Sequence, residues 1–380
     1  MIDKRMMRNL DYLFILVAMM ILGVSLLVMS TASITLNNIH PYYYLKLQLV
    51  WIASGIGLVL LLSLLDYQVL RKLAWWLYGI NVALLLAVLL FGEQAKGASR
   101  WIAITSSVSI QPSEFAKVLI IICFADFIAQ RKGKLNTFKD FLPAFLYIGL
   151  PMVLIMLQPD LGTGLVFVAI MIGIMLVGGA NPIKLFTIFV LIFALAAGAV
   201  FAHTQFGLPI PLKDYQVQRI TTFLSPAPKT MNVSGDSYQV MQSMVAIGSG
   251  GMWGKGYRDG TQGQLNFLPE HHTDFIFSIV GEEFGFIGSV TLLFLYLILL
   301  LRAIGVAMNA HDQFGALIVT GVVAMLSFHV LVNVGMTSGI MPVTGIPLPL
   351  VSYGGSAMWS NLLAIGLVIN VSLRRERLMF

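Results

Sequence analysis

Long apolar runs alternate with short polar stretches along most of the chain. A helix needs about 20 apolar residues to cross a bilayer, and only helices or closed barrels satisfy the backbone in lipid. The pattern therefore predicts an all-α membrane protein of about ten transmembrane helices in one domain, residues 1–380. The predicted spans, of which the fifth and sixth are short, lie near residues 12–30, 46–65, 73–91, 115–129, 142–157, 163–178, 184–203, 275–301, 314–337 and 349–373.

Composition supports lipid as the main solvent. The chain is 58% hydrophobic and 11% charged, with mean hydropathy +0.87, whereas soluble domains carry about 25% charged residues. The net charge of +6 fits an excess of Lys and Arg in cytoplasmic loops and does not indicate a nucleic-acid partner. The single Cys123 lies in an apolar run, so a disulfide within one chain and a cysteine metal site are both excluded.

The distribution of basic residues predicts the orientation. If the N-terminus is cytoplasmic, fourteen of the 23 Lys and Arg residues fall in cytoplasmic segments, against three in short outer loops. Both termini are therefore expected in the cytoplasm. The first apolar run is long enough to span and lacks a clear cleavage site, so we expect it to be retained as a helix. Residues 204–274 form one long extracytoplasmic loop, in which Tyr238–Ile247 is expected to be ordered and partly embedded.

Ionisable residues at membrane depth are costly and mark functional sites. In the predicted topology they gather on the outer side, which favours a site open to one face over a path through the membrane. Asp126, on the cytoplasmic side, is expected to pair with Arg131. The outer set comprises Lys96, Arg100, Glu114, Lys117, Asp160, Arg219, Lys255, Glu270 and Asp274.

Two carboxylates of this set stand at predicted helix starts. Glu114 and Lys117 are three residues apart and share a helix face, so a simple helix-start ion pair is as good an explanation as a binding role. Asp160 follows a tight turn, where the helix dipole alone would favour a carboxylate.

Asp274 stands at the mouth of a span, directly before an apolar stretch. A carboxylate in this position can accept a proton from a sugar hydroxyl, although a capping role at the helix start is the alternative. Glu282 and Glu283 lie deeper on the same helix, about 80° and 180° around it from Asp274 at about 100° per residue. The three carboxylates cannot form one cluster, and a structural role is expected for one of the glutamates.

Residues 345–356 combine prolines and glycines with Ser352 and Ser356 just before the last span. Such a sequence predicts a broken helix, which is tolerated at membrane depth only where the backbone is buried in protein or lines a cavity. The segment would suit a pyrophosphate or a sugar; a re-entrant turn with a packing role is the alternative.

Seven motifs in order along nearly the whole chain resemble the SEDS family (shape, elongation, division and sporulation). The resemblance is strongest to its elongation branch, through Gly260–Phe267 and the short termini, while the division and sporulation branches remain alternatives. It implies a fold of ten transmembrane helices. The motifs are Lys96–Trp101, Gln111–Glu114 with Lys117, Gln158–Thr163, Asp214–Arg219, Ala246–Gly251, Phe267–Phe277 and Pro347–Ser356.

The resemblance implies a peptidoglycan glycosyltransferase that polymerises lipid II and releases undecaprenyl pyrophosphate. The essential aspartate of the family maps onto Asp274, which would deprotonate the 4-hydroxyl of the acceptor GlcNAc for attack on C1 of the donor MurNAc. As a further hypothesis from charge and side, cationic side chains neutralise the pyrophosphate. Those cations are Arg100, Lys117, Arg219 and Lys255. The other expected substrate-binding residues are Glu114, Asp160, Glu270, Ser352 and Ser356.

The resemblance also implies surroundings and partners. The expected location is the bacterial cytoplasmic membrane, with the active site on the extracytoplasmic side. The expected partners are a class B penicillin-binding protein, which is a transpeptidase, and other membrane proteins of the elongation complex. On family grounds a divalent cation, Mg²⁺ or Mn²⁺, is an expected cofactor, although the sequence shows no dedicated set of ligands.

Two other functions stay open at this stage. A lipid II flippase would place polar residues through the whole membrane depth and charge on both sides. A non-catalytic scaffold for the transpeptidase would tolerate the loss of Asp274, whereas the enzyme would not.

Overall fold

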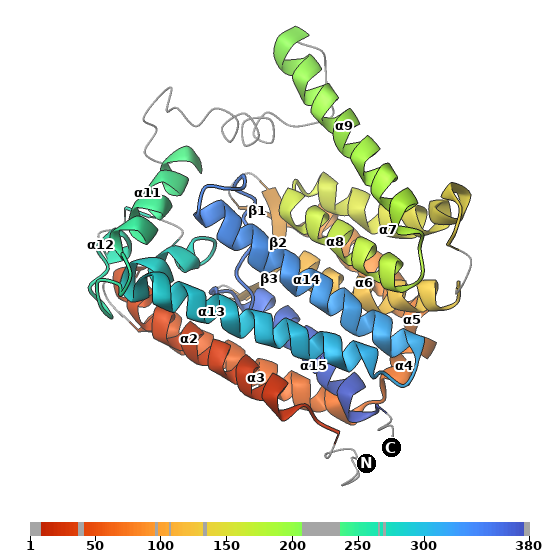
Figure 1. Cartoon of the computed structure of the whole chain (residues 1–380), viewed down its shortest axis with the longest axis horizontal. Coiled ribbons are helices and arrows are strands. Elements are labelled where there is room, and N and C mark those ends of the chain that lie inside the picture. The colour runs from red at the N-terminus through yellow and green to blue at the C-terminus, as the bar shows by residue number, and fades with distance from the viewer. Residues whose placement is uncertain are drawn as a thin grey trace.

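The computed structural model describes residues 9–36, 42–95, 98–105, 108–131, 135–206, 236–264, 267–268 and 271–375 (Figure 1). Within these ranges ten helices of 17 or more residues run through the molecule, and each overlaps one of the predicted spans. They are α2 (Tyr12–Leu36), α3 (Tyr43–Leu64), α5 (Ala74–Phe91), α6 (Pro112–Ala129), α7 (Phe138–Leu157), α8 (Leu161–Val177), α9 (Pro182–Phe206), α13 (Ile276–Met308), α14 (Gln313–Thr337) and α15 (Gly355–Leu373).

Eight of these helices are long and apolar enough to cross a membrane. Of the other two, α8 has 17 residues, and α6 carries the charged residues Glu114, Lys117 and Asp126. The chain is an integral membrane protein with an all-α bundle. α14 and α15 form its centre, because 61% and 83% of the residues in their most apolar 18-residue stretches are buried. α9 lies at the edge, and only 6% of the corresponding residues are buried there (Figure 1).

The first and last described residues, Asn9 and Arg375, meet at one end of the bundle. The amide of Asn9 donates to the carbonyl of Arg375 at 2.9 Å, and the Ser372 hydroxyl donates to the carbonyl of Asn9 at 3.1 Å. The described part of each terminus therefore lies on the same side, as the distribution of basic residues predicts.

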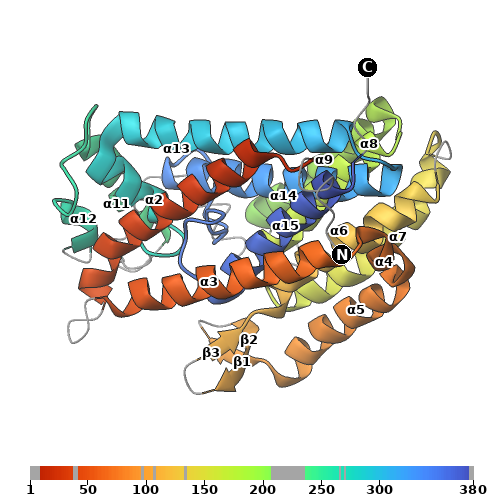
Figure 2. The ribbon, with the colours of Figure 1, turned by 90° about the horizontal axis from the view of Figure 1, so that it is seen from below.

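A small antiparallel sheet precedes α6, and hydropathy did not predict it. Its strands are β1 (Glu93–Ala95), β2 (Ala98–Thr105) and β3 (Val108–Ile110), in that order. Figure 2 shows it at the margin of the bundle, beside the end of α5. β2 carries Arg100, and β3 leads directly into the first turn of α6, so the sheet fixes the entry to that helix.

Three short helices complete the fold of the described residues. α4 (Tyr67–Lys72) begins where the Asp66 side chain accepts a hydrogen bond from the backbone N–H of Gln68. α11 (Asp236–Ser249) covers the stretch predicted to be ordered in the long loop, and α12 (Thr261–Gln264) follows it.

The long helix α13 is broken at Gly285, whose φ of 66° leaves the helical region. The glycine-rich loop 250–256 lies against this break and bonds the backbone groups that the break frees. The N–H of Lys255 donates to the carbonyl of Glu282 at 3.0 Å, and the N–H of Phe286 donates to the carbonyl of Gly251 at 2.9 Å. A Cβ on Gly254 would meet the Glu283 carbonyl, so only glycine allows this approach.

The segment 338–354, between α14 and α15, is not helical. The broken helix predicted for residues 345–356 is confirmed over residues 345–354, and α15 begins at Gly355 and not near residue 349. Positive φ angles at Gly345 (72°) and Gly354 (149°) explain the glycines. This segment lies at the end of the bundle where α13 and α15 begin, which is the end opposite the termini.

Candidate functional site

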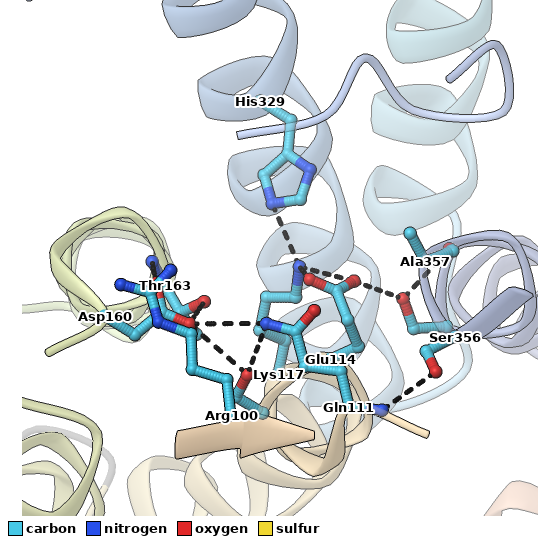
Figure 3. Close-up of polar contacts among 11 residues, drawn as sticks. Arg100, Gln111, Glu114, Lys117, Asp160, Thr163, His329, Ser356 and Ala357 are labelled. Atoms are coloured by element: carbon cyan, nitrogen blue, oxygen red, sulfur yellow. Dashed lines mark hydrogen bonds and ion pairs between the residues drawn. The ribbon is translucent and has the colours of Figure 1, made fainter. Parts of the chain in front are cut away.

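A buried ion pair stands at the start of α6 (Figure 3). Pro112 occupies the first turn, where its missing N–H costs nothing. Lys117 Nζ lies 2.8 and 2.9 Å from the two carboxylate oxygens of Glu114, as the three-residue spacing predicts. The Ser360 hydroxyl of α15 also donates to Glu114 at 3.0 Å, and His329 Nε2 of α14 lies 3.3 Å from Lys117 Nζ. Side chains of α6, α14 and α15 therefore all contact one ion pair.

Both members of this pair are almost fully enclosed: Glu114 is 4% exposed and Lys117 is 1% exposed. The charge of Lys117 is already matched by Glu114. Lys117 was predicted to neutralise a pyrophosphate. In this structure its side chain is buried in the pair with Glu114, and its effect on a pyrophosphate stays a prediction.

Asp160 caps α8 and meets Arg100 from the sheet. Its carboxylate accepts from the backbone N–H of Thr163 at 3.2 Å and from the Thr163 hydroxyl at 2.9 Å, so its predicted place at a helix start is confirmed. Arg100 Nη1 lies 3.8 Å from Asp160 Oδ1 (Figure 3), and the same guanidinium donates to the carbonyls of Gln158 and Pro159. The Arg100 side chain remains 26% exposed, so it can contact a ligand as well as the carboxylate.

Asp274 is half-buried directly before α13. The N-cap of that helix is Phe275, which makes no side-chain capping bond, and the helix begins at Ile276. Asp274 therefore lies one residue before the N-cap position. A Cβ placed on Gly345 would lie 3.4 Å from Asp274 Oδ2, so the carboxylate faces the backbone of the broken segment.

The broken segment also joins Asp274 to the charges on α6 and α8. Ser352 Oγ donates to the Thr273 carbonyl at 2.6 Å, and the Ser356 hydroxyl accepts from the N–H of Gln111 at 3.0 Å. The Gln111 side chain continues to Asp160 Oδ2 at 3.4 Å (Figure 3). Ser352 in the segment and Ser356 in the first turn of α15 are both buried, at 3% and 4% exposure.

Lys255 lies apart from this group. Its Nζ is 2.6 Å from Glu282 Oε1 and 2.8 Å from the Thr261 hydroxyl, and the same carboxylate oxygen accepts from the N–H of Thr261 at 2.7 Å. Glu283, the next residue, accepts from Thr31 of α2 at 3.2 Å. Glu282 thus holds the loop against the break in α13, and a structural role for one of the glutamates is confirmed.

The expectation that Asp126 pairs with Arg131 is wrong. Arg71 of α4 takes that place, with Nε 3.1 Å from Asp126 Oδ1, while the Arg131 guanidinium lies over the ring of Phe127 at 3.7 Å. Arg131 was chosen because it is the nearer arginine in the sequence. In the structure, α4, which connects α3 and α5, places Arg71 next to Asp126.

Two predicted substrate-binding residues, Arg219 and Glu270, lie outside the described residues, as does Lys96. Two other polar residues of the site escaped the sequence analysis. His329 and Asn333 are 0% exposed and, with Thr337, recur every fourth residue along apolar α14. That spacing puts them on one helix face, and it was the signal in the sequence that could have revealed them.

The expected divalent cation stays a prediction. Within the described ranges no group of three or more His, Cys, Asp or Glu side chains is placed to hold a metal ion.

Comparison with known proteins agrees with this architecture. Residues 10–377 match the family model for the FtsW, RodA and SpoVE proteins, described as cell cycle protein. The chain is 38% identical to the peptidoglycan glycosyltransferase MrdB of Escherichia coli over 86% of this chain and 85% of that protein.

Solved structures share the fold. A chain of a peptidoglycan synthase complex that coordinates polymerization and crosslinking superposes with a TM-score of 0.78 and 30% identity, covering 96% of this chain and 97% of that one. The rod shape determining protein RodA of Thermus thermophilus has a TM-score of 0.71 and 29% identity, covering 97% and 98%. The chain belongs to the FtsW/RodA/SpoVE family of cell cycle proteins, the SEDS family that its motifs resemble.

Proposed function

We propose that this protein is a peptidoglycan glycosyltransferase of the elongation branch, which polymerises lipid II to maintain rod shape. The names of MrdB and of the Thermus protein support the activity and the branch. The observation that carries the proposal is the position of Asp274. Its half-buried carboxylate faces the broken segment, which leads into α15. Ser356 and Ser360 of that helix bond Gln111 and Glu114, and Gln111 in turn bonds Asp160.

Asp274 acts as the general base in this proposal. It takes the proton from the 4-hydroxyl of the acceptor GlcNAc, and the resulting oxygen forms a bond to C1 of the donor MurNAc. The bond between C1 and the phosphate oxygen breaks, and its electron pair leaves with undecaprenyl pyrophosphate. A carboxylate at a helix mouth, partly removed from water, suits this transfer because fewer waters compete for its lone pairs.

Arg100 is the best placed of the predicted cations to meet the developing charge on the pyrophosphate. Its guanidinium is partly exposed and is held by two carbonyls and a carboxylate, so it is preorganised for a bidentate anion contact. Lys117 acts indirectly, by keeping α6, α14 and α15 in register. Glu114, Asp160, Ser352 and Ser356 shape the floor of the site; Arg219, Lys255 and Glu270 remain proposed contacts.

We further propose that the site opens to the extracytoplasmic side of the bacterial cytoplasmic membrane. The site elements lie at the end of the bundle opposite the termini, which the basic residues place in the cytoplasm. A class B penicillin-binding protein is the proposed partner, supported by the likeness to a chain of a synthase complex that joins polymerization to crosslinking. Other elongation-complex membrane proteins and membrane lipid complete the surroundings.

The test compares lipid II polymerisation by the purified wild type and by Asp274→Asn, each with a transpeptidase partner. The substitution keeps the size of the side chain and removes the base. We expect long glycan strands from the wild type and none from the variant, with unchanged thermal stability and partner binding.

Each other outcome favours a different function. Strands from both proteins would show that Asp274 is not the base. Strands from neither, with lipid II moved between leaflets of a vesicle, would favour a flippase. Strands from neither without such transport would favour the scaffold.

A further inference from the structure

The backbone on which Asp274 stands is held at three successive carbonyl groups. The carbonyl of His272 accepts from the N–H of Tyr353 at 3.0 Å. The carbonyl of Thr273 accepts from Ser352 Oγ at 2.6 Å, and that of Asp274 accepts from Asn333 Nδ2 at 2.8 Å. These donors come from two separate parts of the chain, the broken segment and helix α14.

Asn333 joins the two sides of this arrangement. Its amide nitrogen carries two hydrogens, and the second bond runs to the carbonyl of Ile346 at 2.8 Å. Ile346 follows Gly345, the residue whose backbone faces the Asp274 carboxylate. One side chain therefore fixes the distance between the backbone that carries the base and the backbone opposite its carboxylate.

This placement of Asn333 carries a cost. The residue is 0% exposed, and its Oδ1 has no hydrogen-bond partner among the described residues. A buried acceptor without a partner is destabilising, and an apolar residue would suit this buried position on a membrane helix better. The two hydrogen bonds donated by the amide nitrogen of Asn333 offset this cost.

Ser352 completes the restraint from the other side. Its hydroxyl donates to the Thr273 carbonyl and accepts from the N–H of Leu348 at 2.8 Å. The hydroxyl thus links Thr273, the residue before Asp274, to Leu348, which precedes Ser352 by four residues in the broken segment.

We propose that Asn333 and Ser352 are positioning residues for Asp274. They hold its backbone so that the carboxylate stays at one distance from the segment 345–346, where the acceptor hydroxyl is deprotonated. The inference rests on the proposed function of Asp274 as the base. Neither residue touches the reacting atoms, and each acts through the aspartate.

The experiment measures lipid II polymerisation by Asn333→Leu in the full chain with its transpeptidase partner. Leucine keeps the number and branching of the side-chain heavy atoms and removes both donated bonds. A misplacement of about 1 Å can cost about 100-fold in rate, so we expect the maximal rate to fall about 10- to 100-fold. The lipid II concentration at half-maximal rate should change by less than about threefold, because binding is not the step affected.

Asn370→Leu is the matched control. Asn370 is also 0% exposed, and its Nδ2 donates two bonds, to the carbonyls of Leu62 at 2.6 Å and Leu65 at 2.9 Å, at the opposite end of the bundle. We expect a similar loss of thermal stability from both variants, with the maximal rate of Asn370→Leu within about twofold of the wild type.

A second readout distinguishes positioning from general support. In an Asp274→Glu background the carboxylate is already displaced, so Asn333→Leu should lower the remaining rate by less than it does in the wild type. If Asn333→Leu does not give a stable protein, Ser352→Ala is judged by the same criteria, since it removes the bond to Thr273 together with the bond from Leu348.

Three results would overturn the inference. The first is a rate for Asn333→Leu no lower than that of Asn370→Leu. The second is a raised half-saturating concentration with an unchanged maximal rate. The third is an undiminished effect in the Asp274→Glu background. A wild type that makes no strands, or an Asp274→Asn variant that makes them, contradicts the proposed function instead.

Discussion

The two ends of helix α6 each carry a charged pair, and the two pairs differ in how they are built. At one end Glu114 and Lys117 pair within the helix, and their side chains are 5% and 2% exposed. At the other end Asp126 pairs with Arg71 from α4, whose side chain is 42% exposed. The first pair is enclosed by α14 and α15, and the second has one partner in contact with solvent or headgroups.

The difference indicates what each pair is for. A buried pair loses more hydration than a half-exposed one and is rarely the most stable solution for a helix interior. Its retention beside Asp160 and Ser356 fits a role in shaping the site. The Asp126–Arg71 pair ties two helices at the far end, where water screens the interaction and its contribution is small.

Lys117→Met should show the largest difference between the two pairs. The change removes the cation and leaves Glu114 buried with Ser360 as its remaining donor. Removing one partner of a buried pair costs about 3–5 kcal/mol, so we expect a large fall in Tm and no glycan polymerisation. Thermal unfolding of the purified protein in detergent measures the first effect and lipid II polymerisation the second.

The control for Lys117→Met is the double variant Glu114→Gln with Lys117→Met, which removes both charges. We expect it to recover much of the lost Tm, because no unpaired charge remains, yet to stay inactive. Recovery of both stability and activity would show that the pair serves only the fold.

Hydropathy predicted the helices of this protein because each must match the thickness of the bilayer with apolar side chains. It did not predict β1, β2 and β3. Polar and apolar residues alternate there over stretches too short to distinguish a strand from a loop. Sequence spacing likewise found the Glu114–Lys117 pair, a local contact, and failed for Arg71–Asp126, which depends on how α4 folds back.

The same contrast applies to the site. Asp274, Asp160 and Arg100 were found because charges in an apolar chain are conspicuous. Asn333 was missed because an uncharged amide within a helix has many structural explanations. What reveals it is its pair of bonds to the carbonyls of Asp274 and Ile346, and these depend on a segment that no periodicity describes.

Arg71→Met should have a much smaller effect than Lys117→Met, although it also removes the cation of a pair on α6. Exposed pairs contribute about 0–1 kcal/mol, and the Asp126 carboxylate keeps the bond from the Gln130 side chain at 2.6 Å. We expect a Tm within a few degrees of the wild type and full polymerase activity. A loss of Tm equal to that of Lys117→Met would end the distinction between the two ends of the helix.

The smallest expected effect is that of acid pH on Asp312, at the end of the bundle where Asp126 and Arg71 pair. Burial alone would raise its pKa, but hydrogen bonds from Gln68 and Tyr67, the N–H of Gly315 and the charge of Arg71 hold the pKa below its ordinary value. A carboxylate with a lowered pKa contributes stability above its unfolded pKa, about 3.9, and loses that contribution as the pH falls through its folded pKa. The Tm advantage of wild type over Asp312→Asn should therefore be complete at pH 6 and shrink below about pH 4. Without Arg71 the advantage at pH 6 should be smaller, since the pKa of Asp312 moves back toward its ordinary value while its unfolded pKa is unchanged; an unchanged advantage would show that Arg71 serves Asp126 alone.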